Sequence, residues 1–388
     1  MRKSWEDNIM RIGINFHTFD KYISGVEYYT LGMVDSLLRL ENRDEYVIFT
    51  NVPHYFAQYT SNQSHRVTVN KIDGIKTRTQ RILWEHFQLP RCVRREKLNV
   101  LHCPCYICPV TIKEIPCAVT IHDTIAIDHP GWCKPSNAAY FNMVMKMSLR
   151  ASAAIVAVSH SAARDVARNY SLDKTKIKVV YPGIDPIFNS KKNRQCHIKI
   201  RERYHLPEKY ILYVGNLEPK KNIGVVLSSF LSLKKRSFPY KLVLAGKRQW
   251  GVKSLIKKIL REDKNNDVLF PGYILRADLP SVYQLAKVFI YPSLYEGFGF
   301  PPLEAMACGV PVISSSRGAL KETLGDAACL IDPAKPLEIS HALRRMTAEP
   351  DFRNKYIQKG FRQCRRYDWK KTALKLSAVY KDTVANYV

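Results

Sequence analysis

The stretch that most constrains the fold spans residues 291–312 and reads YPSLYEGFGFPPLEAMACGVPV. The apolar run 288–291 just before it predicts a buried strand. Gly297 and Gly299 permit backbone conformations that residues with a Cβ resist, and the pair of prolines that follows suits the first turn of a helix. A helix beginning there should be short and end at Gly309. The order of strand, glycine turn and helix is typical of the phosphate-binding units of α/β proteins.

Two carboxylates, Glu296 and Glu304, stand eight positions apart in this stretch. A helix N-terminus behind a glycine turn offers backbone N–H groups and a partial positive charge, so the turn residues Gly297, Phe298 and Gly299 are expected to bind a diphosphate. Glu296 would accept hydrogen bonds from ligand hydroxyls. Glu304, in the first helical turn, would stay ionised and hold a ribose diol. The pattern suggests a nucleotide sugar as the ligand. The alternative, which a glutamate pair alone would favour, is two solvated glutamates on a purely structural unit.

The same string resembles the signature of family 4 retaining glycosyltransferases, in which Glu-x7-Glu lies inside EGFG-x-P-x-x-EA-x-A-x-G-x-PV. The resemblance covers nearly the whole chain and is strongest over 210–333. It implies an α/β protein of the GT-B fold, with two Rossmann-like domains facing across a cleft. It also implies that Glu296 contacts the donor sugar and takes part in catalysis, while Glu304 meets the nucleotide ribose.

Along the rest of the chain, strand and helix patterns alternate in two successive series. A chain of 388 residues is too long for one typical hydrophobic core and long enough to form two domains. A charge-rich segment without clear period follows the Pro182–Pro186 region, and we predict an N-terminal domain over 1–186 and a donor-binding domain over 187–368. In the fold that the chain resembles, the final helix, here 369–388, crosses back to the N-terminal domain.

A second phosphate-binding pattern opens the second half. The predicted strand 210–216 contains a glycine and is followed by Lys220 and Lys221 at the start of a helix. Two lysines there can neutralise a diphosphate without a metal, although a pair of solvated lysines is the alternative. The segment resembles the family motif G-R-L-x-x-x-K, which gives Lys221 a catalytic role and places Asn216 where many members have arginine. The residues that could substitute for that arginine are Lys220, Lys247 and Arg248. Tyr273, at the end of another strand, either stacks on the nucleotide base or simply packs.

In the first half, polar residues stand near the end of the predicted strand 118–123. Ligands bind at the carboxyl ends of parallel strands, so His122 and Asp123 are candidates. The resemblance implies that His122 contacts the donor sugar near the reacting carbon, whereas Asp123 more plausibly orients a loop on the acceptor side. Gly25, preceded by Ser24 where family members often have a second glycine, would let a ligand approach the backbone. His102 is a weaker candidate.

The formal net charge of +27 attracts anions of every kind, including nucleotide diphosphates, anionic lipids and nucleic acid. No leader sequence or membrane-spanning run is evident, so we expect a cytoplasmic protein, with peripheral contact on the inner face of the membrane as an open alternative. A basic helix carrying Trp84 and Phe87 would suit such a contact, although an ordinary amphipathic helix is at least as plausible. The ten cysteines suggest buried, reduced thiols, and those near His102 lack the spacing of a zinc site, so no metal is expected.

The family resemblance therefore implies a metal-independent, retaining hexosyltransferase without a cofactor. Segments 213–222 and 291–305 look most like those of bacterial mannosyltransferases, which implies GDP-mannose as the nucleotide-sugar donor. The implied acceptor is a saccharide or lipid-linked saccharide in surface polysaccharide or lipopolysaccharide synthesis. A UDP-sugar or another GDP-sugar is the alternative donor. Two remote alternatives are a non-catalytic protein that binds nucleotide sugars and a nucleic-acid-binding protein, although the chain has no recognisable nucleic-acid reader motif and no nucleic-acid partner is expected.

Overall fold

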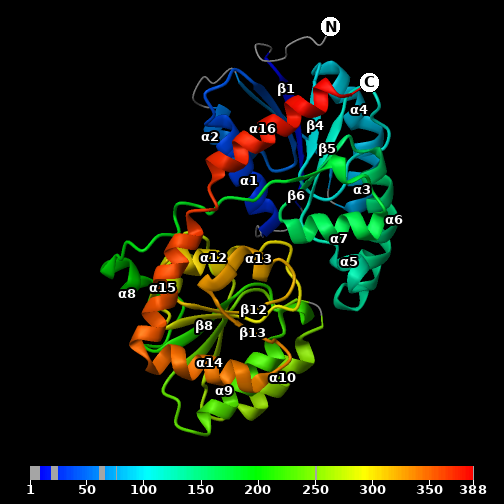
Figure 1. Ribbon diagram of the computed structural model, residues 1–388. Helices are drawn as coiled ribbons and strands as arrows, with labels where there is room; N and C mark the ends of the chain where they lie inside the picture. The colour runs from blue at the N-terminus through cyan, green and yellow to red at the C-terminus, as the bar shows by residue number, and fades with distance from the viewer. Residues whose placement is uncertain (1–8, 19–24, 61–65, 76, 250, 388) are drawn as a thin grey trace. The chain divides into compact units, whose positions relative to one another are not determined.

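The computed structural model describes residues 9–18, 25–60, 66–75, 77–249 and 251–387. The chain divides into two compact units (Figure 1): Met1–Gly183 together with Asp368–Val388, here called the N-terminal unit, and Ile184–Tyr367, the C-terminal unit. Each is built around one parallel sheet with helices packed on it, which confirms the predicted α/β class. Across these described stretches, no helix combines the length and the apolar character needed to span a bilayer.

The N-terminal unit has a seven-stranded sheet in the order β3-β2-β1-β4-β5-β6-β7, with every pairing parallel. Its strands are β1 (Arg11–Phe16), β2 (Glu45–Thr50), β3 (Val67–Lys71), β4 (Val100–Cys103), β5 (Cys117–Ile121), β6 (Ala154–Ala157) and β7 (Ile177–Val179). Its helices are α1 (Gly25–Leu38), α2 (Ala57–Thr60), α3 (Arg78–Leu83), α4 (Leu89–Arg95), α5 (Ile125–Asp128), α6 (Pro135–Ala151), α7 (His160–Tyr170) and α16 (Trp369–Ala385).

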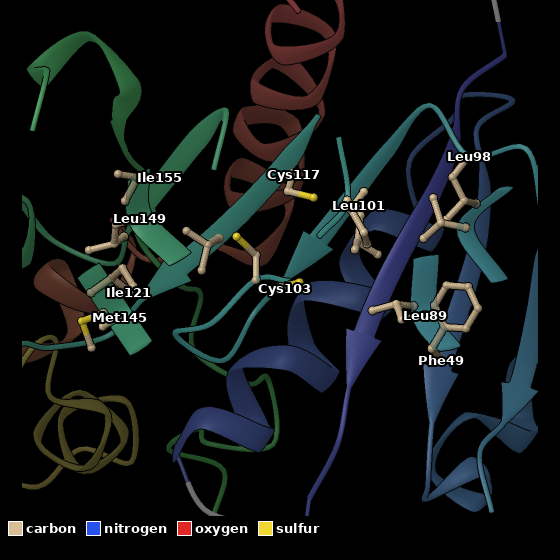
Figure 2. Close-up of a cluster of buried hydrophobic side chains, with 14 of the residues drawn as sticks. Phe49, Leu89, Leu98, Leu101, Cys103, Cys117, Ile121, Met145, Leu149 and Ile155 are labelled. Carbon is tan, nitrogen blue, oxygen red and sulfur yellow. The ribbon is translucent and has the colours of Figure 1, made fainter. Parts of the chain in front are cut away.

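The core of this unit lies where helices cover the sheet. Strands such as β4 and β5 are buried along their whole length, because helices on both faces exclude water from a parallel sheet. Figure 2 shows the side chains of Cys103 and Cys117 among aliphatic and aromatic neighbours, and both are buried. All ten cysteines are free, as the sequence predicted, but the expectation that they are buried holds only for Cys103, Cys108, Cys117 and Cys308, and Cys196 is exposed.

The C-terminal helix α16 packs on α1 within the N-terminal unit (Figure 1). Gly32 in α1 makes this contact possible, since a Cβ there would lie 2.4 Å from the ring of Trp369. Gly183 likewise lets the preceding chain pass the start of α16, because a Cβ there would lie 2.3 Å from the backbone nitrogen of Trp369. The hydroxyl of Thr372 also donates to the carbonyl of Tyr181 (2.7 Å), which ties the end of the first half of the chain to the start of α16.

The C-terminal unit has a six-stranded parallel sheet in the order β10-β9-β8-β11-β12-β13. Its strands are β8 (Tyr210–Val214), β9 (Lys241–Ala245), β10 (Val268–Gly272), β11 (Val288–Tyr291), β12 (Val312–Ser315) and β13 (Cys329–Ile331). Its helices are α8 (Arg194–Arg203), α9 (Ile223–Lys234), α10 (Lys253–Glu262), α11 (Leu279–Leu285), α12 (Phe300–Ala307), α13 (Leu320–Leu324), α14 (Pro336–Ala348) and α15 (Pro350–Cys364).

The segment with Trp84 and Phe87 differs from a simple amphipathic helix. Between α3 and α4 the chain forms one π-helical turn, Trp84–Gln88. Trp84 is buried against Phe49, whereas Phe87 is 64% exposed. The two aromatic side chains therefore do not form one exposed face, and the suggestion of a joint membrane contact is wrong for Trp84.

Candidate active site

The predicted donor residues gather at the point where the strand order of the C-terminal sheet reverses. Strands β8 and β11 are neighbours there, and the chain leaves them in opposite directions across the sheet. Lys221 follows β8, and Glu296 follows β11. The backbone N–H of Leu294 donates to the carbonyl of Lys220 (2.8 Å), which joins the two loops. Open α/β sheets bind their ligands at the carboxyl ends of strands beside this kind of reversal.

Lys221 and Glu296 form a buried ion pair, with side chains 9% and 11% exposed. The hydroxyl of Tyr291 accepts from Lys221 Nζ (2.8 Å) and donates to Glu296 Oε1 (3.0 Å). Ser293 Oγ donates to the same carboxylate oxygen (2.6 Å). In this structure, therefore, the two residues expected to face the donor face each other.

The ion pair keeps both groups charged. Burial alone would lower the pKa of Lys221, but the adjacent Glu296 carboxylate raises it overall. Burial would raise the pKa of Glu296, and the ammonium of Lys221 holds it below its ordinary value instead. The result is a buried pair of fixed, opposite charges at the carboxyl edge of the sheet.

Two glycines shape the turn around Glu296. Gly299, the N-cap of α12, has φ +97°, and a Cβ there would lie 2.6 Å from Leu320 Cδ2. Gly318 has φ +56° and lies so close to the backbone of Glu296 that a Cβ would come within 2.7 Å of its carbonyl oxygen. The turn is also held through the carbonyl of Phe298, which accepts from Thr323 Oγ1 (2.9 Å).

The start of α12 has fewer N–H donors than the sequence argument assumed. The helix begins at Phe300, so the two prolines fill its second and third positions, and neither has an N–H. Of the positions from the N-cap Gly299 to Pro302, only Gly299 and Phe300 can donate. A diphosphate bound here would depend on the turn backbone and on Lys221 more than on the helix end.

Glu304 lies in the second turn of α12, not in the first as predicted, because the helix starts at Phe300, one residue before the two prolines. Its side chain is buried, and its oxygens accept from Arg276 Nη1 (3.3 Å) and from the hydroxyl of Tyr283 (3.0 Å). Burial raises the pKa of Glu304 despite the opposing effect of Arg276. Arg276, rather than the helix end, is therefore the main support of its charge.

Arg276 is a residue that the sequence argument missed. Its guanidinium pairs with Asp185 (3.0 Å) as well as with Glu304, and it lies over the ring of Phe188 (4.9 Å to the centroid). The signal was present in the sequence: like Lys221, Arg276 is a cation that follows a strand ending in glycine. Tyr291 was predicted only as a strand residue, and nothing in its pattern indicates that its hydroxyl bridges the ion pair.

The remaining donor-side candidates lie along the same edge of the sheet. The carbonyl of Asn216 accepts from the hydroxyl of Tyr213 (3.2 Å), and Lys220 Nζ lies 3.7 Å from Glu218. Lys247 Nζ lies over the ring of Tyr273 (5.6 Å to the centroid). Arg248 similarly lies over Phe270 (5.2 Å). Tyr273 thus already has a cationic neighbour at the end of β10.

In the N-terminal unit, His122 follows β5 as predicted and is 9% exposed. Its Nε2 donates to the carbonyl of Pro104 (2.9 Å), and its ring packs against the edges of Tyr29 and Tyr106. Burial lowers the pKa of His122, so the imidazole is neutral and presents the lone pair of Nδ1. Its geometry suits a hydrogen-bond acceptor better than an acid.

The other N-terminal candidates have more local roles. Asp123 Oδ1 accepts from the backbone N–H of Ile125 (3.3 Å) and so shapes the loop before α5. Gly25 begins α1, and a Cβ there would meet nothing within 4 Å. Ser24 lies outside the described residues. Both ring nitrogens of His102 are bonded, to Tyr380 (2.6 Å) and Thr120 (2.8 Å), which makes His102 a core residue.

Acid should destabilise the N-terminal unit through two buried histidines. Burial lowers the pKa of His17 and of His102 to about 3, whereas an unfolded histidine titrates near its ordinary value of 6.5. Below pH 6.5 the unfolded chain binds more protons, so the free energy of unfolding should fall until the pH reaches about 3. These two groups give a slope of about 2.7 kcal/mol per pH unit, and His122, whose pKa burial also lowers, adds to it with the same sign. Urea unfolding followed between pH 6 and 4 measures this slope.

A variant separates the contribution of a histidine to this slope from the contributions of carboxyl groups that titrate in the same pH range. Burial raises the pKa of Glu85, so the folded state takes up this proton at a higher pH than the unfolded chain does. The contribution of Glu85 to the slope of the unfolding free energy therefore has the opposite sign. His102→Gln keeps side-chain hydrogen bonding and should reduce the slope by about 1.4 kcal/mol per pH unit. An unchanged slope in this variant would contradict the assignment.

Comparisons with known proteins agree with this architecture. The profile of the family described as Glycosyltransferase Family 4 matches residues 23–188, and that of Glycosyl transferases group 1 matches residues 198–363. The chain belongs to family 4 of the glycosyltransferases. It has the GT-B fold of two Rossmann-like domains, and the class of enzyme that the fold and the sequence define is a glycosyltransferase.

Among curated relatives, the chain is 28% identical to O-antigen chain mannosyltransferase B of Escherichia coli, over 78% of this chain and 81% of that protein. It is 30% identical to O-antigen chain mannosyltransferase RfbU of Salmonella typhimurium over 60% of this chain, and this match spans 61% of that protein's length. Among solved structures, Anabaena Alr3699/HepE in complex with UDP-glucose superposes with a TM-score of 0.75 at 16% identity, covering 96% of this chain and 100% of that one.

Proposed function

We propose that this protein is a retaining, metal-independent mannosyltransferase. It would transfer mannose from GDP-mannose to a saccharide or lipid-linked saccharide acceptor in surface polysaccharide or lipopolysaccharide synthesis. The mannose assignment is supported by the names of its relatives, which are O-antigen mannosyltransferases. A UDP-sugar or another GDP-sugar is the second candidate donor, since a neighbour with the same fold holds UDP-glucose.

The observation that carries the proposal is the buried Lys221–Glu296 pair beside the sheet reversal. As the bond to the sugar breaks, negative charge grows on the departing diphosphate. Lys221, already charged and held in place by Tyr291, stabilises that charge without having to reorganise. The backbone N–H groups of the turn at Gly297 and Gly299 add to this stabilisation. A cation built into the protein makes a bound metal unnecessary.

The two carboxylates have separate roles. Glu296 accepts hydrogen bonds from the sugar hydroxyls through Oε2, since its contacts with Lys221, Tyr291 and Ser293 are all made by Oε1. Glu304 accepts from the ribose diol, since a carboxylate has more lone pairs than Arg276 and Tyr283 occupy. Retention follows from the family resemblance: the acceptor attacks on the face from which the diphosphate leaves, and the diphosphate takes the acceptor proton.

In the N-terminal unit, His122 is proposed to accept from a hydroxyl of the donor sugar through Nδ1. Asp123 and Gly25 shape the loops on the acceptor side. The net charge of +27 is proposed to favour peripheral contact with an anionic membrane on its cytoplasmic face, where lipid-linked acceptors are found.

A nucleotide-sugar panel tests the proposal. GDP-mannose should raise the melting temperature more than GDP-glucose, GDP-fucose, UDP-glucose or UDP-galactose, and it should be slowly hydrolysed to the α-anomer of mannose when no acceptor is present. EDTA should leave the hydrolysis rate unchanged. Stabilisation by a UDP-sugar alone would move the assignment to the second donor, and no response to any sugar nucleotide would overturn the proposed function.

A further inference from the structure

A polar cluster in the N-terminal unit is not used by the proposed donor site. It consists of Asn15, His17, Arg81 and Glu85, here called the β1 cluster. Asn15 lies in β1, and His17 follows the carboxyl end of that strand. Strand β1 has β2 on one side and β4 on the other, so the strand order of this sheet reverses beside it. The cluster therefore occupies the place where an open parallel sheet binds a ligand.

The cluster is buried and internally bonded. Asn15, His17 and Glu85 are 4%, 6% and 3% exposed. Asn15 Nδ2 donates to Glu85 Oε1 (2.9 Å), and Asn15 Oδ1 accepts from His17 Nε2 (2.8 Å). Arg81 Nε lies 3.4 Å from Glu85 Oε1, so its charge is opposed by a carboxylate. One amide thus connects the imidazole to the carboxylate.

Three atoms of the cluster remain open. Among the residues that the structure describes, His17 Nδ1, Glu85 Oε2 and Arg81 Nε are buried and have no hydrogen-bond partner. The first two are acceptors, since His17 donates through Nε2 to Asn15 and the carboxylate has only lone pairs, whereas Arg81 Nε is a donor. Buried acceptors without donors cost free energy, and native proteins rarely leave them so without a functional reason.

The backbone at Glu85 is also unusual. Glu85 lies in the π-helical turn Trp84–Gln88, between the regular helices α3 and α4. Such turns are rare and occur frequently at functional sites. This turn places Trp84 edge-on against the ring of His17, with 5.2 Å between centroids. The imidazole is therefore held in position by Asn15 on one side and by an indole on another.

We propose that the β1 cluster binds hydroxyl groups of the saccharide acceptor, which donate to His17 Nδ1 and Glu85 Oε2. The two open acceptors match a ligand that supplies O–H donors, which a phosphate diester, fully ionised at neutral pH, does not. A sugar hydroxyl oxygen can also accept from the open Arg81 Nε. The identification of the ligand as the acceptor rests on the proposed function, which assigns the nucleotide sugar to the C-terminal unit.

The variant Glu85→Gln tests the proposal directly. Its amide oxygen keeps the bond from Asn15, and its NH2 group replaces the open acceptor with a donor. Transfer to octyl glycosides of mannose, glucose, galactose and N-acetylglucosamine is compared with donor hydrolysis by the same variant. The ratio of transfer to hydrolysis should fall about 20-fold, as expected for one lost hydrogen bond to a charged group.

The matched control is Glu96→Gln. Glu96 pairs with Arg11 (2.9 Å) at the opposite, amino end of β1 and is also largely buried. This variant loses the same charge in the same unit and should keep the wild-type ratio of transfer to hydrolysis. Melting temperatures of both variants show whether Glu85→Gln has lost its fold rather than its ligand.

A second measurement does not depend on turnover. In protein labelled with 15N-histidine, the octyl glycoside that the enzyme uses best should shift the Nδ1 resonance of His17, and the Glu85→Gln variant should reduce that shift. Equal transfer-to-hydrolysis ratios in the two variants, or no shift with any of the four glycosides, would overturn the β1 cluster as the acceptor site. Loss of wild-type donor hydrolysis would instead overturn the proposed function.

Discussion

Replacing Lys221 with alanine should lower the turnover number by about 10²- to 10³-fold, the usual effect of removing one electrostatic contact to a transition state. The affinity for the nucleotide sugar should fall much less, because the charge that Lys221 stabilises grows only as the sugar leaves. Steady-state kinetics with the donor identified by the panel measure both quantities. A variant that changes KM and leaves kcat intact would assign Lys221 to ground-state binding.

The same variant should also be less stable, for a reason unrelated to catalysis. Without Lys221, the side-chain hydrogen bonds that the described residues still donate to the buried Glu296 carboxylate come from the hydroxyls of Tyr291 and Ser293. Breaking a buried ion pair by removing one partner costs about 3–5 kcal/mol. Urea unfolding of the Lys221→Ala variant should show a loss of this size.

A double variant separates the two effects. Lys221→Met with Glu296→Gln removes both charges, so it should recover most of the lost stability, since neutral pairs of similar volume commonly match buried ion pairs. Its turnover should remain low. Lys234→Ala serves as the control, because Lys234 forms an ion pair with Asp267 (2.9 Å) in the same unit, away from the carboxyl edge. Recovery of turnover in the double variant would show that Lys221 acts only on the fold.

The pH dependence of this pair has a defined sign. Glu296 has a folded pKa below its ordinary value of 4.5, so its contribution to stability is present above pH 4.5 and is lost as the pH falls through the folded pKa. Lys221 has a raised folded pKa, so its contribution is present at neutral pH and is lost only in strong alkali. The ion pair is therefore intact across the neutral range.

Much of the fold follows from local sequence patterns. Apolar runs such as 288–291 predict strands that the structure contains, because a strand buried on both faces of a parallel sheet needs apolar side chains throughout. Glycines and prolines mark the turns for equally local reasons. The two halves of the chain could be recognised as separate α/β units because each repeats this alternation.

The partners of the site residues could not be predicted in the same way. Lys221 and Glu296 are 75 positions apart, and their pairing depends on β8 and β11 being neighbours, which only the strand order decides. The β1 cluster joins residues from β1 and from a π-helical turn 70 positions later. Helical periodicity could not reveal that turn, since its inserted residue shifts which side chains face inward.

Glu304 illustrates how a local error changes a chemical argument. Counting from the prolines placed it in the first helical turn, where the helix dipole would keep it ionised. The helix starts at Phe300, Glu304 falls in the second turn, and burial raises its pKa. Its charge depends instead on Arg276, which is 28 positions away in the sequence.

Replacing Glu304 with glutamine should weaken nucleotide binding by about 10- to 100-fold. The expected loss is that of a hydrogen bond to a charged group, about 1.5–3 kcal/mol. Calorimetry with GDP and UDP measures the effect without any acceptor. Both nucleotides should lose affinity to a similar degree, because the ribose is common to them. Unchanged affinity for both would remove Glu304 from the site.

The wild-type protein should also lose nucleotide affinity in mild acid in a way that Glu304→Gln does not. Because burial raises the pKa of Glu304, its carboxyl takes up a proton above pH 4.5 as the pH falls, and the neutral form is a weaker acceptor for the ribose hydroxyls. The difference in binding free energy between wild type and variant should therefore shrink from pH 7.5 to pH 5. Asp267→Asn is the matched control, since Asp267 is also buried and paired with a cation, Lys234, but lies at the amino end of β10. A difference that stays constant with pH would mean that the carboxylate charge of Glu304 takes no part in binding.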